Sequence, residues 1–322
     1  SKVYTNDNVM RLDELPARMV VIGGGVIAAE FSHVFSAFGT EITQLNRSSR
    51  LLRGVDEEVV ARFEEAASKQ WNIVKDASLS EIRENADGSV TVVAKRTSEN
   101  GEELFEIPAD AVLVATGRRP NTDTLNAKNY FDVQDGGQLS VDKYQRVLYN
   151  GAPVPGIYAL GDVSSRYQLK HVANHEARVV QHNLSHPEDL RASDHRYVPG
   201  AVFSNPQIAV VGMTEEQARQ AAEREGFEIT VKAQNFGDTA YGWAMEDKIG
   251  LCKLIARKDN GELLGAHLVG EESSVLIQPL LQAMSFGMDA RTLARGQYWI
   301  HPALTEIVEN ALLGLEFDEP AN

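Results

Sequence analysis

Three small residues near the amino end are spaced to bind the pyrophosphate of a dinucleotide. Gly23, Gly25 and Ala28 form a GxGxxA pattern that follows the β-branched run Arg18–Ile22 and opens a helical pattern. In such a turn the first glycine permits a tight bend, the second lets the backbone approach the pyrophosphate, and the alanine lets the helix pack closely. The helix N-terminus adds N–H donors and a favourable dipole. Because strand, turn, helix and second strand stand at the expected spacing, the sequence predicts dinucleotide binding rather than a purely structural turn.

The end of the second predicted strand indicates which dinucleotide is bound. An NAD enzyme places an acidic residue there for the ribose 2′-hydroxyl, whereas this chain has Asn46 followed by Arg47, Arg50 and Arg53. A guanidinium group can pair bidentately with a 2′-phosphate, which a carboxylate would repel. The arginines could instead be solvated loop charges beside the acidic helix that begins near Asp56. With the acid absent, they favour NADP(H).

The order of the elements predicts an α/β fold. Residues 1–118 alternate strands and helices, with a second strand at Glu41–Leu45 and a helix that Asp56 caps. Residues 119–195 are less periodic, contain one strand-like segment at Ile157–Leu160, and indicate a piece of a larger domain. The first part therefore has the pattern of a Rossmann-like domain.

The last part, residues 196–322, has a different pattern, in which several strands are followed by helices. Thr214 and Gln217 could form the capping box of one helix. Two further helices are expected over Ser274–Phe286 and Leu304–Leu312. This order predicts an α+β unit.

The composition excludes several classes of protein. The 31 Lys+Arg and 46 Asp+Glu give a formal net charge of −15, which argues against binding to nucleic acid or to anionic membranes. With 43% hydrophobic and 24% charged residues the chain is expected to be globular, and no apolar run is long enough to span a bilayer. The single cysteine, Cys252, rules out an internal disulfide or a CxxC site and favours the reducing cytoplasm. The histidines show no HxH or HExxH spacing, so no metal site is predicted.

Four motifs, in order along the whole chain, resemble those of the flavin-dependent pyridine nucleotide-disulfide oxidoreductases. They are Gly23-x-Gly25-x-x-Ala28-x-Glu30, Ala115–Asn121 (ATGRRPN), Gly156–Asp162 (GIYALGD), and His301-Pro302 with Glu306. The resemblance implies an NADP(H)-binding Rossmann-like domain at 1–118, the remaining part of an FAD-binding domain at 119–195, and an α+β dimerisation domain at 196–322. The closing run Gln297–Leu304, with Glu309–Leu315, narrows the resemblance to one member of this family.

The resemblance also implies roles for individual residues. Cofactor contacts are implied for Gly23, Gly25, Ala28, Glu30, Asn46, Arg47, Arg53, Gly117, Asp162, Leu169, Lys170 and His171. Among them, Glu30 would lie near the nicotinamide, and Arg47 and Arg53 would hold the 2′-phosphate. Asp162 would hydrogen-bond the flavin ribityl chain. The backbone of Leu169–His171 would lie beneath the flavin pyrimidine, where a helix N-terminus stabilises negative charge.

His301 and Glu306 are the expected catalytic pair. Disulfide reduction needs an acid that protonates the leaving thiolate and a base that holds the attacking thiol ionised, and an imidazole oriented by a carboxylate supplies both. In the family this histidine reaches the active site of the other subunit, so a homodimer is implied. Without the other motifs, His301-Pro302 would more simply be a turn that starts a helix.

The chain departs from the family in two respects. The family passes electrons from NADPH to flavin, then to a CxxxxC dithiol and a small-molecule disulfide, but this chain has only Cys252, in a predicted strand. It also has one glycine-rich turn where the family has two. We therefore expect a carboxyl-terminal portion of a reductase, which binds NADPH and dimerises but does not turn over. Two alternatives stay open: an NAD-linked, dihydrolipoamide dehydrogenase-like enzyme, and a noncatalytic NADP-binding dimerisation module.

Overall fold

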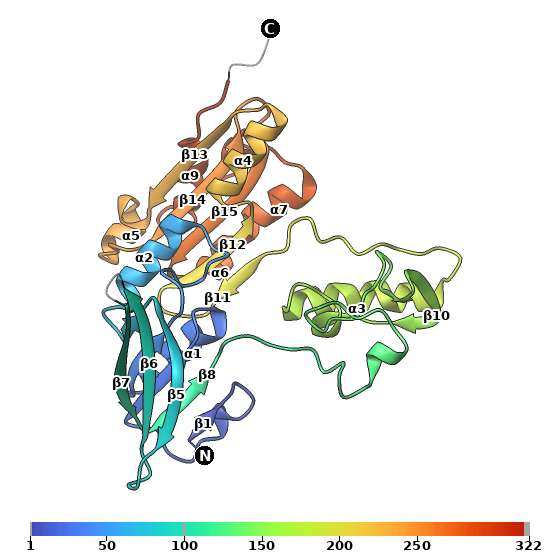
Figure 1. Ribbon diagram of the computed structural model, residues 1–322. Helices are drawn as coiled ribbons and strands as arrows, with labels where there is room; N and C mark the ends of the chain where they lie inside the picture. Colours follow the sequence, from blue (N-terminus) through green and yellow to red (C-terminus); the bar gives the residue numbers. More distant parts are fainter. Residues whose placement is uncertain (1, 99–100, 319–322) are drawn as a thin grey trace. The chain divides into compact units, whose positions relative to one another are not determined.

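The computed structural model describes residues 2–98 and 101–318 and divides the chain into two compact units (Figure 1). The first unit combines the described residues up to Thr116, here the amino-terminal region, with those from Pro199 onward, the carboxyl-terminal region. The second unit spans Gly117–Val198. In the described parts of the chain, no helix is both long and apolar enough to cross a membrane.

A five-stranded parallel sheet forms the centre of the amino-terminal region. Its strands are β1 (Val3–Tyr4), β2 (Arg18–Ile22), β3 (Glu41–Leu45), β4 (Asn72–Val74) and β8 (Ala111–Val114), in the spatial order β1-β8-β2-β3-β4. The associated helices are α1 (Val26–Ala37), α2 (Glu57–Ala67) and the short 3-10 turn η1 (Val9–Arg11). The connections from β2 through α1 to β3, and through α2 to β4, are parallel βαβ units. The predicted α/β fold is therefore confirmed.

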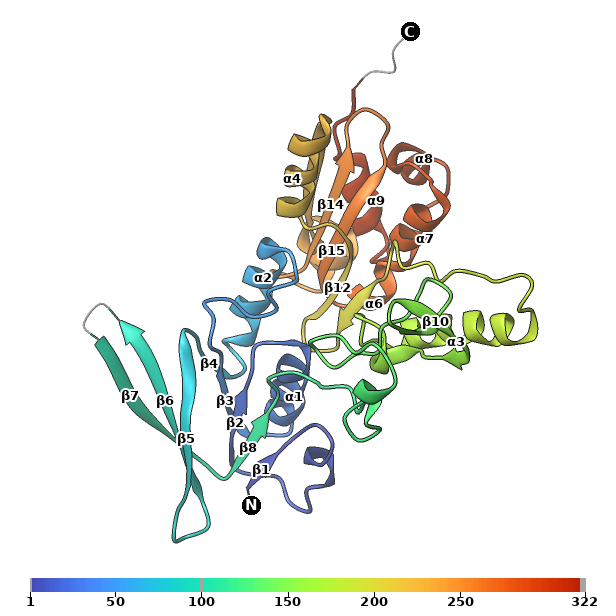
Figure 2. The same ribbon diagram turned by 45° about the vertical axis from the view of Figure 1, so that its right-hand side comes forward.

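The central strand β2 is buried on both faces, as its continuous apolar sequence predicts. Because neighbouring side chains on a strand point to opposite faces, Met19 and Val21 belong to one core cluster with α1 and α2, whereas Val20 and Ile22 belong to another. The second cluster includes residues of the antiparallel strands β5 (Ala77–Glu84), β6 (Val90–Ser98) and β7 (Gly101–Ala109), which Figure 2 shows as a separate sheet. The parallel sheet thus packs between helices and a second sheet.

An antiparallel sheet with helices forms the carboxyl-terminal region, which is the α+β arrangement predicted. Its strands are β11 (Gly200–Val202), β12 (Gln207–Gly212), β13 (Ile229–Asn235), β14 (Leu251–Arg257) and β15 (Leu263–Gly270), in the order β11-β12-β15-β14-β13. The helical segments are α4 (Glu215–Glu225), η4 (Phe236–Asp238), α5 (Ala240–Ala244), α6 (Ser273–Leu276), α7 (Gln278–Phe286), α8 (Ala290–Arg295) and α9 (Glu306–Leu313). The predicted capping box of Thr214 and Gln217 is present at the start of α4.

The single helix predicted over Ser274–Phe286 is wrong, because the structure divides this segment into α6 and α7 at Ile277. Pro279 lies in the first turn of α7. Proline lacks a backbone N–H and its ring clashes with the carbonyl four residues earlier, so it is tolerated at a helix start but not in a helix interior. Apolar residues recur at helical spacing on both sides of Ile277, so the pattern predicts one helix instead of two.

The two regions of the first unit share one hydrophobic core. Leu51, Val59 and Phe63, from α2 and the loop before it, belong to the same buried cluster as Leu251 and Val269 on β14 and β15. Figure 1 shows α2 against these two strands. The regions are therefore one packed body, although the second unit separates them along the chain.

The second unit contains a hairpin and one long helix. Its elements are η2 (Ala127–Asn129), β9 (Arg146–Tyr149), β10 (Ala152–Tyr158), η3 (Gly161–Val163) and α3 (Lys170–Ser185). The prediction of one strand at Ile157–Leu160 is wrong, since β10 begins earlier and pairs with β9 in an antiparallel hairpin. Pro153 and Pro155 interrupt the pattern, and the register shifts between Pro153 and Tyr158. The prolines therefore concealed the strand.

Candidate functional site

The glycine turn after β2 has the geometry that pyrophosphate binding requires. Gly23 has φ +143°, and a Cβ on it would lie 2.3 Å from the carbonyl oxygen of Ala115. By contrast, a Cβ on Gly25 would meet no atom of the described protein within 4 Å. Gly25 is also the N-cap of α1, where no described side chain caps the helix, and Ala28 is fully buried. Open space beside free N–H donors at a helix start fits a pyrophosphate.

Substitution by alanine is expected to have different effects at Gly23 and at Gly25. Gly23→Ala is expected to destabilise the fold by about 3 kcal/mol, because alanine is strained at this φ and clashes with Ala115. Gly25→Ala should change stability by less than about 1 kcal/mol, since its backbone is extended, yet weaken dinucleotide binding. Thermal melting and NADP⁺ titration of both variants provide the check. Equal melting temperatures would contradict this division of roles.

The segment after β3, residues 47–53, is here named the arginine loop, and Asn46 organises it. The Asn46 side chain is buried and its Nδ2 donates to the carbonyl oxygens of Ser48 and Arg50, at 2.7 and 3.1 Å. The backbone N–H of Leu52 donates to the carbonyl oxygen of Gly24 at 2.7 Å. The loop is therefore bonded directly to the glycine turn, and the Asn46 side chain holds the first half of the loop through two carbonyl oxygens.

Two of the arginines in the arginine loop are exposed, and the third is bonded within the loop. Arg47 and Arg53 are exposed, and Arg50 donates from Nη2 to the carbonyl oxygen of Arg53 at 3.1 Å. Within the described residues, none of these arginines forms an ion pair with an acidic side chain. The nearby acids Asp56 and Glu58 pair with Lys253 instead. Exposed arginines without ion pairs fit both interpretations, a 2′-phosphate site and solvated loop charges, so the preference for NADP(H) stays a prediction.

Glu30, predicted to lie near the nicotinamide, has a partner in the carboxyl-terminal region. Its Oε1 accepts a hydrogen bond from the backbone N–H of Phe203 at 2.9 Å. Phe203 follows β11 directly. The carboxylate therefore holds α1 against this strand end, and its role toward a nicotinamide stays a prediction.

In the second unit, Arg118 brings the two predicted flavin motifs together. Its Nη1 donates to Asp162 Oδ2 at 2.8 Å, and its Nη2 donates to the carbonyl oxygen of Gln168 at 2.6 Å, just before Leu169. Gly117, at the start of this unit, has φ +143°. The sequence predicted no role for Arg118, although it lies inside one of the four motifs.

A buried carboxylate supports the same segment. Glu176 of α3 is 1% exposed, and its Oε2 accepts the N–H of Gly161 at 2.6 Å, while His195 Nε2 lies 3.0 Å from its Oε1. Leu169 is the N-cap of α3, and Lys170 and His171 form its exposed first turn. Sequence reasoning missed Glu176, because only the fold reveals a contact between residues 15 positions apart.

His301 and Glu306 meet as predicted. Their Nδ1 and Oε1 atoms lie 2.8 Å apart, and Glu306 Oε2 also accepts the N–H of Ala303 at 3.3 Å. The hydrogen bond from His301 holds the pKa of Glu306 below its usual range. A carboxylate only accepts, so Nδ1 carries the proton. The His301 side chain is 68% exposed, which leaves Nε2 for chemistry at the surface.

Cys252 is a core residue, as its position in a predicted strand indicates. It lies in β14 and is fully buried. Burial strongly raises the pKa of its thiol. A thiol without access to solvent and without a thiolate form is not a nucleophile.

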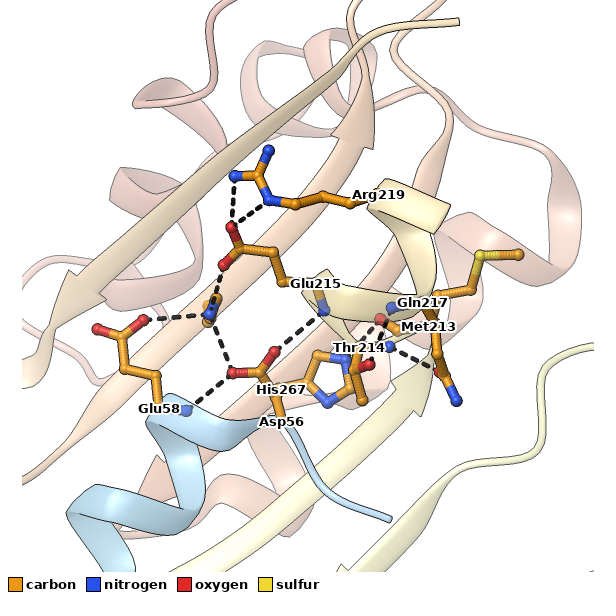
Figure 3. A network of polar contacts seen from close by, with 9 residues as sticks. Asp56, Glu58, Met213, Thr214, Glu215, Gln217, Arg219 and His267 are labelled. Atoms are coloured by element: carbon orange, nitrogen blue, oxygen red, sulfur yellow. Dashed lines mark hydrogen bonds and ion pairs between the residues drawn. The ribbon is translucent and has the colours of Figure 1, made fainter. Parts of the chain in front are cut away.

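Next to Cys252, Lys253 forms a buried cluster that links the two regions of the first unit (Figure 3). Its Nζ lies 3.0 Å from Asp56 Oδ1, 3.2 Å from Glu58 Oε2 and 2.7 Å from Glu215 Oε2. Asp56 also caps α2, since Oδ1 accepts the N–H of Glu58, and its Oδ2 accepts the N–H of Glu215 at 3.1 Å. Three carboxylates, from the N-cap and first turn of α2 and from the first turn of α4, therefore converge on one ammonium group. The cluster has no counterpart in the sequence motifs.

This cluster should make stability depend on pH. Burial opposes ionisation of Asp56 and Glu215, but hydrogen bonds outweigh it and lower the pKa of both carboxyls. Asp56 accepts from the Glu215 N–H and from Lys253, whereas Glu215 accepts from Lys253 and Arg219. The stability that these two carboxylates contribute is therefore fully present above the usual carboxyl pKa, about 4, and is lost as the pH falls through the lowered pKa values. Between about pH 7 and pH 3, the melting temperature should fall less for Asp56→Ser than for wild type. An equal fall of the melting temperature in both proteins would contradict this.

The chain belongs to the pyridine nucleotide-disulphide oxidoreductase family. The family's sequence model matches residues 1–177, and the model of its dimerisation domain matches residues 198–312. Enzymes of this family use FAD and NAD(P)H. The predicted resemblance is confirmed at the level of the family.

Among particular proteins, the chain is 51% identical over 317 residues to mycothione reductase of Mycobacterium tuberculosis strain H37Rv, with 97% of this chain and 65% of the relative covered. Mycothione reductase is also the member that the closing runs indicated. A dihydrolipoyl dehydrogenase of Synechocystis is 32% identical, with 96% and 65% covered. The structure of an HOCl-induced flavoprotein disulfide reductase from Escherichia coli superposes with a TM-score of 0.84 at 28% identity, with 97% and 68% covered. The chain thus spans about two thirds of the length of these relatives.

Proposed function

We propose that the chain supplies the nucleotide-binding and dimerisation parts of an NADPH-dependent flavoprotein disulfide reductase whose substrate is mycothione. The observation that carries the proposal is the His301–Glu306 pair, with Nδ1 and Oε1 2.8 Å apart and the imidazole exposed. Such a pair suits proton transfer to a disulfide that arrives from outside the chain. The 51% identity to mycothione reductase supports the choice of substrate.

NADPH is the proposed reductant. The glycine turn would receive the pyrophosphate at the start of α1, and Arg47 and Arg53 would pair with the 2′-phosphate. Support comes from the open space at Gly25 and from the exposed Arg47 and Arg53, which form no ion pair within the described residues. Glu30, on α1, would face the nicotinamide.

The second unit is proposed to hold part of the FAD. When bound, the flavin supplies two-electron transfer between the nicotinamide and a dithiol. Asp162, oriented by Arg118, would accept a ribityl hydroxyl hydrogen bond. The backbone at Leu169–His171 begins a 16-residue helix, whose dipole would stabilise negative charge on the pyrimidine. The domain limits proposed are 1–118 for the nucleotide, 119–195 for flavin and 196–322 for dimerisation.

His301 would move protons in the active site of a partner subunit in a homodimer. With Nδ1–H donated to Glu306, its Nε2 can take the proton of the attacking thiol and return it to the leaving thiolate. Large apolar side chains close to this pair along the sequence are exposed in the single chain, including Tyr298, Ile300 and Leu313. Their exposure supports burial against a second subunit.

The 322-residue sequence has one cysteine, Cys252, which is buried. The redox dithiol of the proposed reductase would therefore come from residues outside this sequence. The chain by itself should therefore bind NADP⁺ and dimerise without turnover. The proposed compartment is the cytoplasm, where thiols stay reduced.

The test is NADPH oxidation by the longer protein that joins this chain to a CxxxxC dithiol. Mycothione, oxidised glutathione and lipoamide would be supplied separately, with NADH as the control nucleotide. A marked preference for mycothione with NADPH supports the proposal. Preference for lipoamide with NAD(H) would favour the dihydrolipoamide dehydrogenase-like alternative, and nucleotide binding without any disulfide reduction would favour a noncatalytic module.

A further inference from the structure

The arginine loop is fixed at its start, middle and end. Asn46 holds the start through the carbonyl oxygens of Ser48 and Arg50. Leu52 N–H donates to Gly24, and Leu51 N–H donates to Glu64 Oε1 at 2.9 Å. Just beyond the loop, Asp56 caps α2 and anchors the chain that follows it. The place of the loop's guanidinium groups relative to the glycine turn is therefore set by backbone anchors.

The anchor at Asp56 depends on the carboxyl-terminal region. Asp56 is 2% exposed, and its two oxygens contact Lys253 Nζ and the N–H of Glu215, at 3.0 and 3.1 Å (Figure 3). Lys253 is 4% exposed and comes from β14, 197 residues away from Asp56. A buried carboxylate needs such partners, because an unpaired buried charge is costly. Lys253 and the Glu215 N–H therefore help to fix the position of the Asp56 carboxylate.

We propose that Lys253 and Glu215 are positioning residues for nucleotide selectivity: through Asp56, they hold the arginine loop where it can pair with a 2′-phosphate. The inference rests on the proposed roles of Arg47 and Arg53. Bidentate pairing of a guanidinium with a phosphate depends strongly on geometry, whereas the pyrophosphate is held separately at the glycine turn. A small shift of the loop end would therefore weaken binding of a 2′-phosphorylated nucleotide more than binding of NAD⁺.

Two variants test this positioning role. Asp56→Ser retains a good N-cap for α2, but the shorter side chain cannot reach both Lys253 and Glu215. The double variant Lys253→Met with Glu215→Gln removes opposite charges together and leaves Asp56 as the cap. It retains the backbone N–H at position 215, so it tests the Lys253 side chain and its ion pair with Glu215. In both variants we expect the preference for NADP⁺ over NAD⁺ to fall roughly five- to tenfold, with the affinity for NAD⁺ changed by less than about twofold. Lys253→Arg, which keeps the charge, should retain the preference.

Arg62→Gln is the matched control. Arg62 also lies on α2 and reaches the carboxyl-terminal region, where its Nη2 donates to Asn235 Oδ1 at 3.0 Å. It has no hydrogen bond to the described residues of the arginine loop. Its loss should leave the preference for NADP⁺ unchanged, even if the melting temperature falls.

The measurement is isothermal titration calorimetry of the 322-residue chain with NADP⁺, NAD⁺ and 2′,5′-ADP, below the melting temperature of each variant. A selective loss for NADP⁺ and 2′,5′-ADP in both test variants supports the positioning role. Unchanged preference in either folded test variant, or an equal loss for NADP⁺ and NAD⁺, would overturn it while leaving the proposed function intact. A wild-type chain without preference for NADP⁺ would instead reject the proposed nucleotide, and this inference with it.

Discussion

Replacement of His301 by alanine is expected to lower the rate of disulfide reduction in the longer protein by about 10²- to 10⁴-fold, the range for a general acid–base residue. The side chain is 68% exposed, so its removal leaves no internal cavity and should hardly change stability. In the proposed mechanism, reduction of flavin by NADPH does not use the imidazole. Stopped-flow flavin reduction should therefore keep its rate, while steady-state turnover with the disulfide collapses.

Glu306→Gln is the companion variant, because glutamine can still accept the hydrogen bond from Nδ1 but carries no charge. Its expected loss is smaller, about tenfold. Both variants should melt within a few degrees of wild type. Equal losses in flavin reduction and in disulfide reduction would show that His301 supports the fold or the dimer, and would contradict the proposed proton transfer.

Removal of both Arg47 and Arg53 is expected to weaken NADP⁺ binding about 100-fold. Hydrogen bonds to charged groups contribute about 1.5 to 3 kcal/mol each, and every 1.4 kcal/mol changes affinity about tenfold. The Kd for NAD⁺ should stay nearly constant, since NAD⁺ has no 2′-phosphate. Calorimetric titration of the Arg47→Ala, Arg53→Ala chain with both nucleotides measures the two effects without any need for turnover.

Arg50→Ala provides the control within the same loop. Arg50 uses its guanidinium to hold the Arg53 carbonyl oxygen, so its loss should cost NADP⁺ binding less than the double variant does. Raised salt should also weaken binding to wild type more than to the double variant, because ions screen exposed charges. Loss of NAD⁺ and NADP⁺ affinity to the same degree would mean that the arginines shape the site without contacting the 2′-phosphate.

Sequence reasoning succeeded where the signal is local. The strand Arg18–Ile22, the capping box at Thr214 and the contact of His301 with Glu306 all join residues a few positions apart. Periodicity, caps and turn residues act over that range. Cys252 was also correctly placed in the core, because its strand has an apolar pattern.

The contacts that were missed join distant residues. Lys253 meets Asp56 across 197 positions, and Arg118 meets Asp162 across 44. A lysine inside a strand pattern ordinarily indicates the solvent face, and only packing of α2 against β14 converts it into a buried partner. Such pairs follow from the tertiary fold and not from spacing, so no motif could reveal them.

The shared core has a thermodynamic consequence. Because residues of α2 and of β14 lie in one buried cluster, the two regions should unfold together and not in separate steps. A ligand that binds the native state stabilises everything that unfolds with its site. Nucleotide bound at the glycine turn would therefore slow amide exchange in β14 and β15 as well. Binding at the glycine turn would in this way stabilise the antiparallel sheet of the carboxyl-terminal region as well.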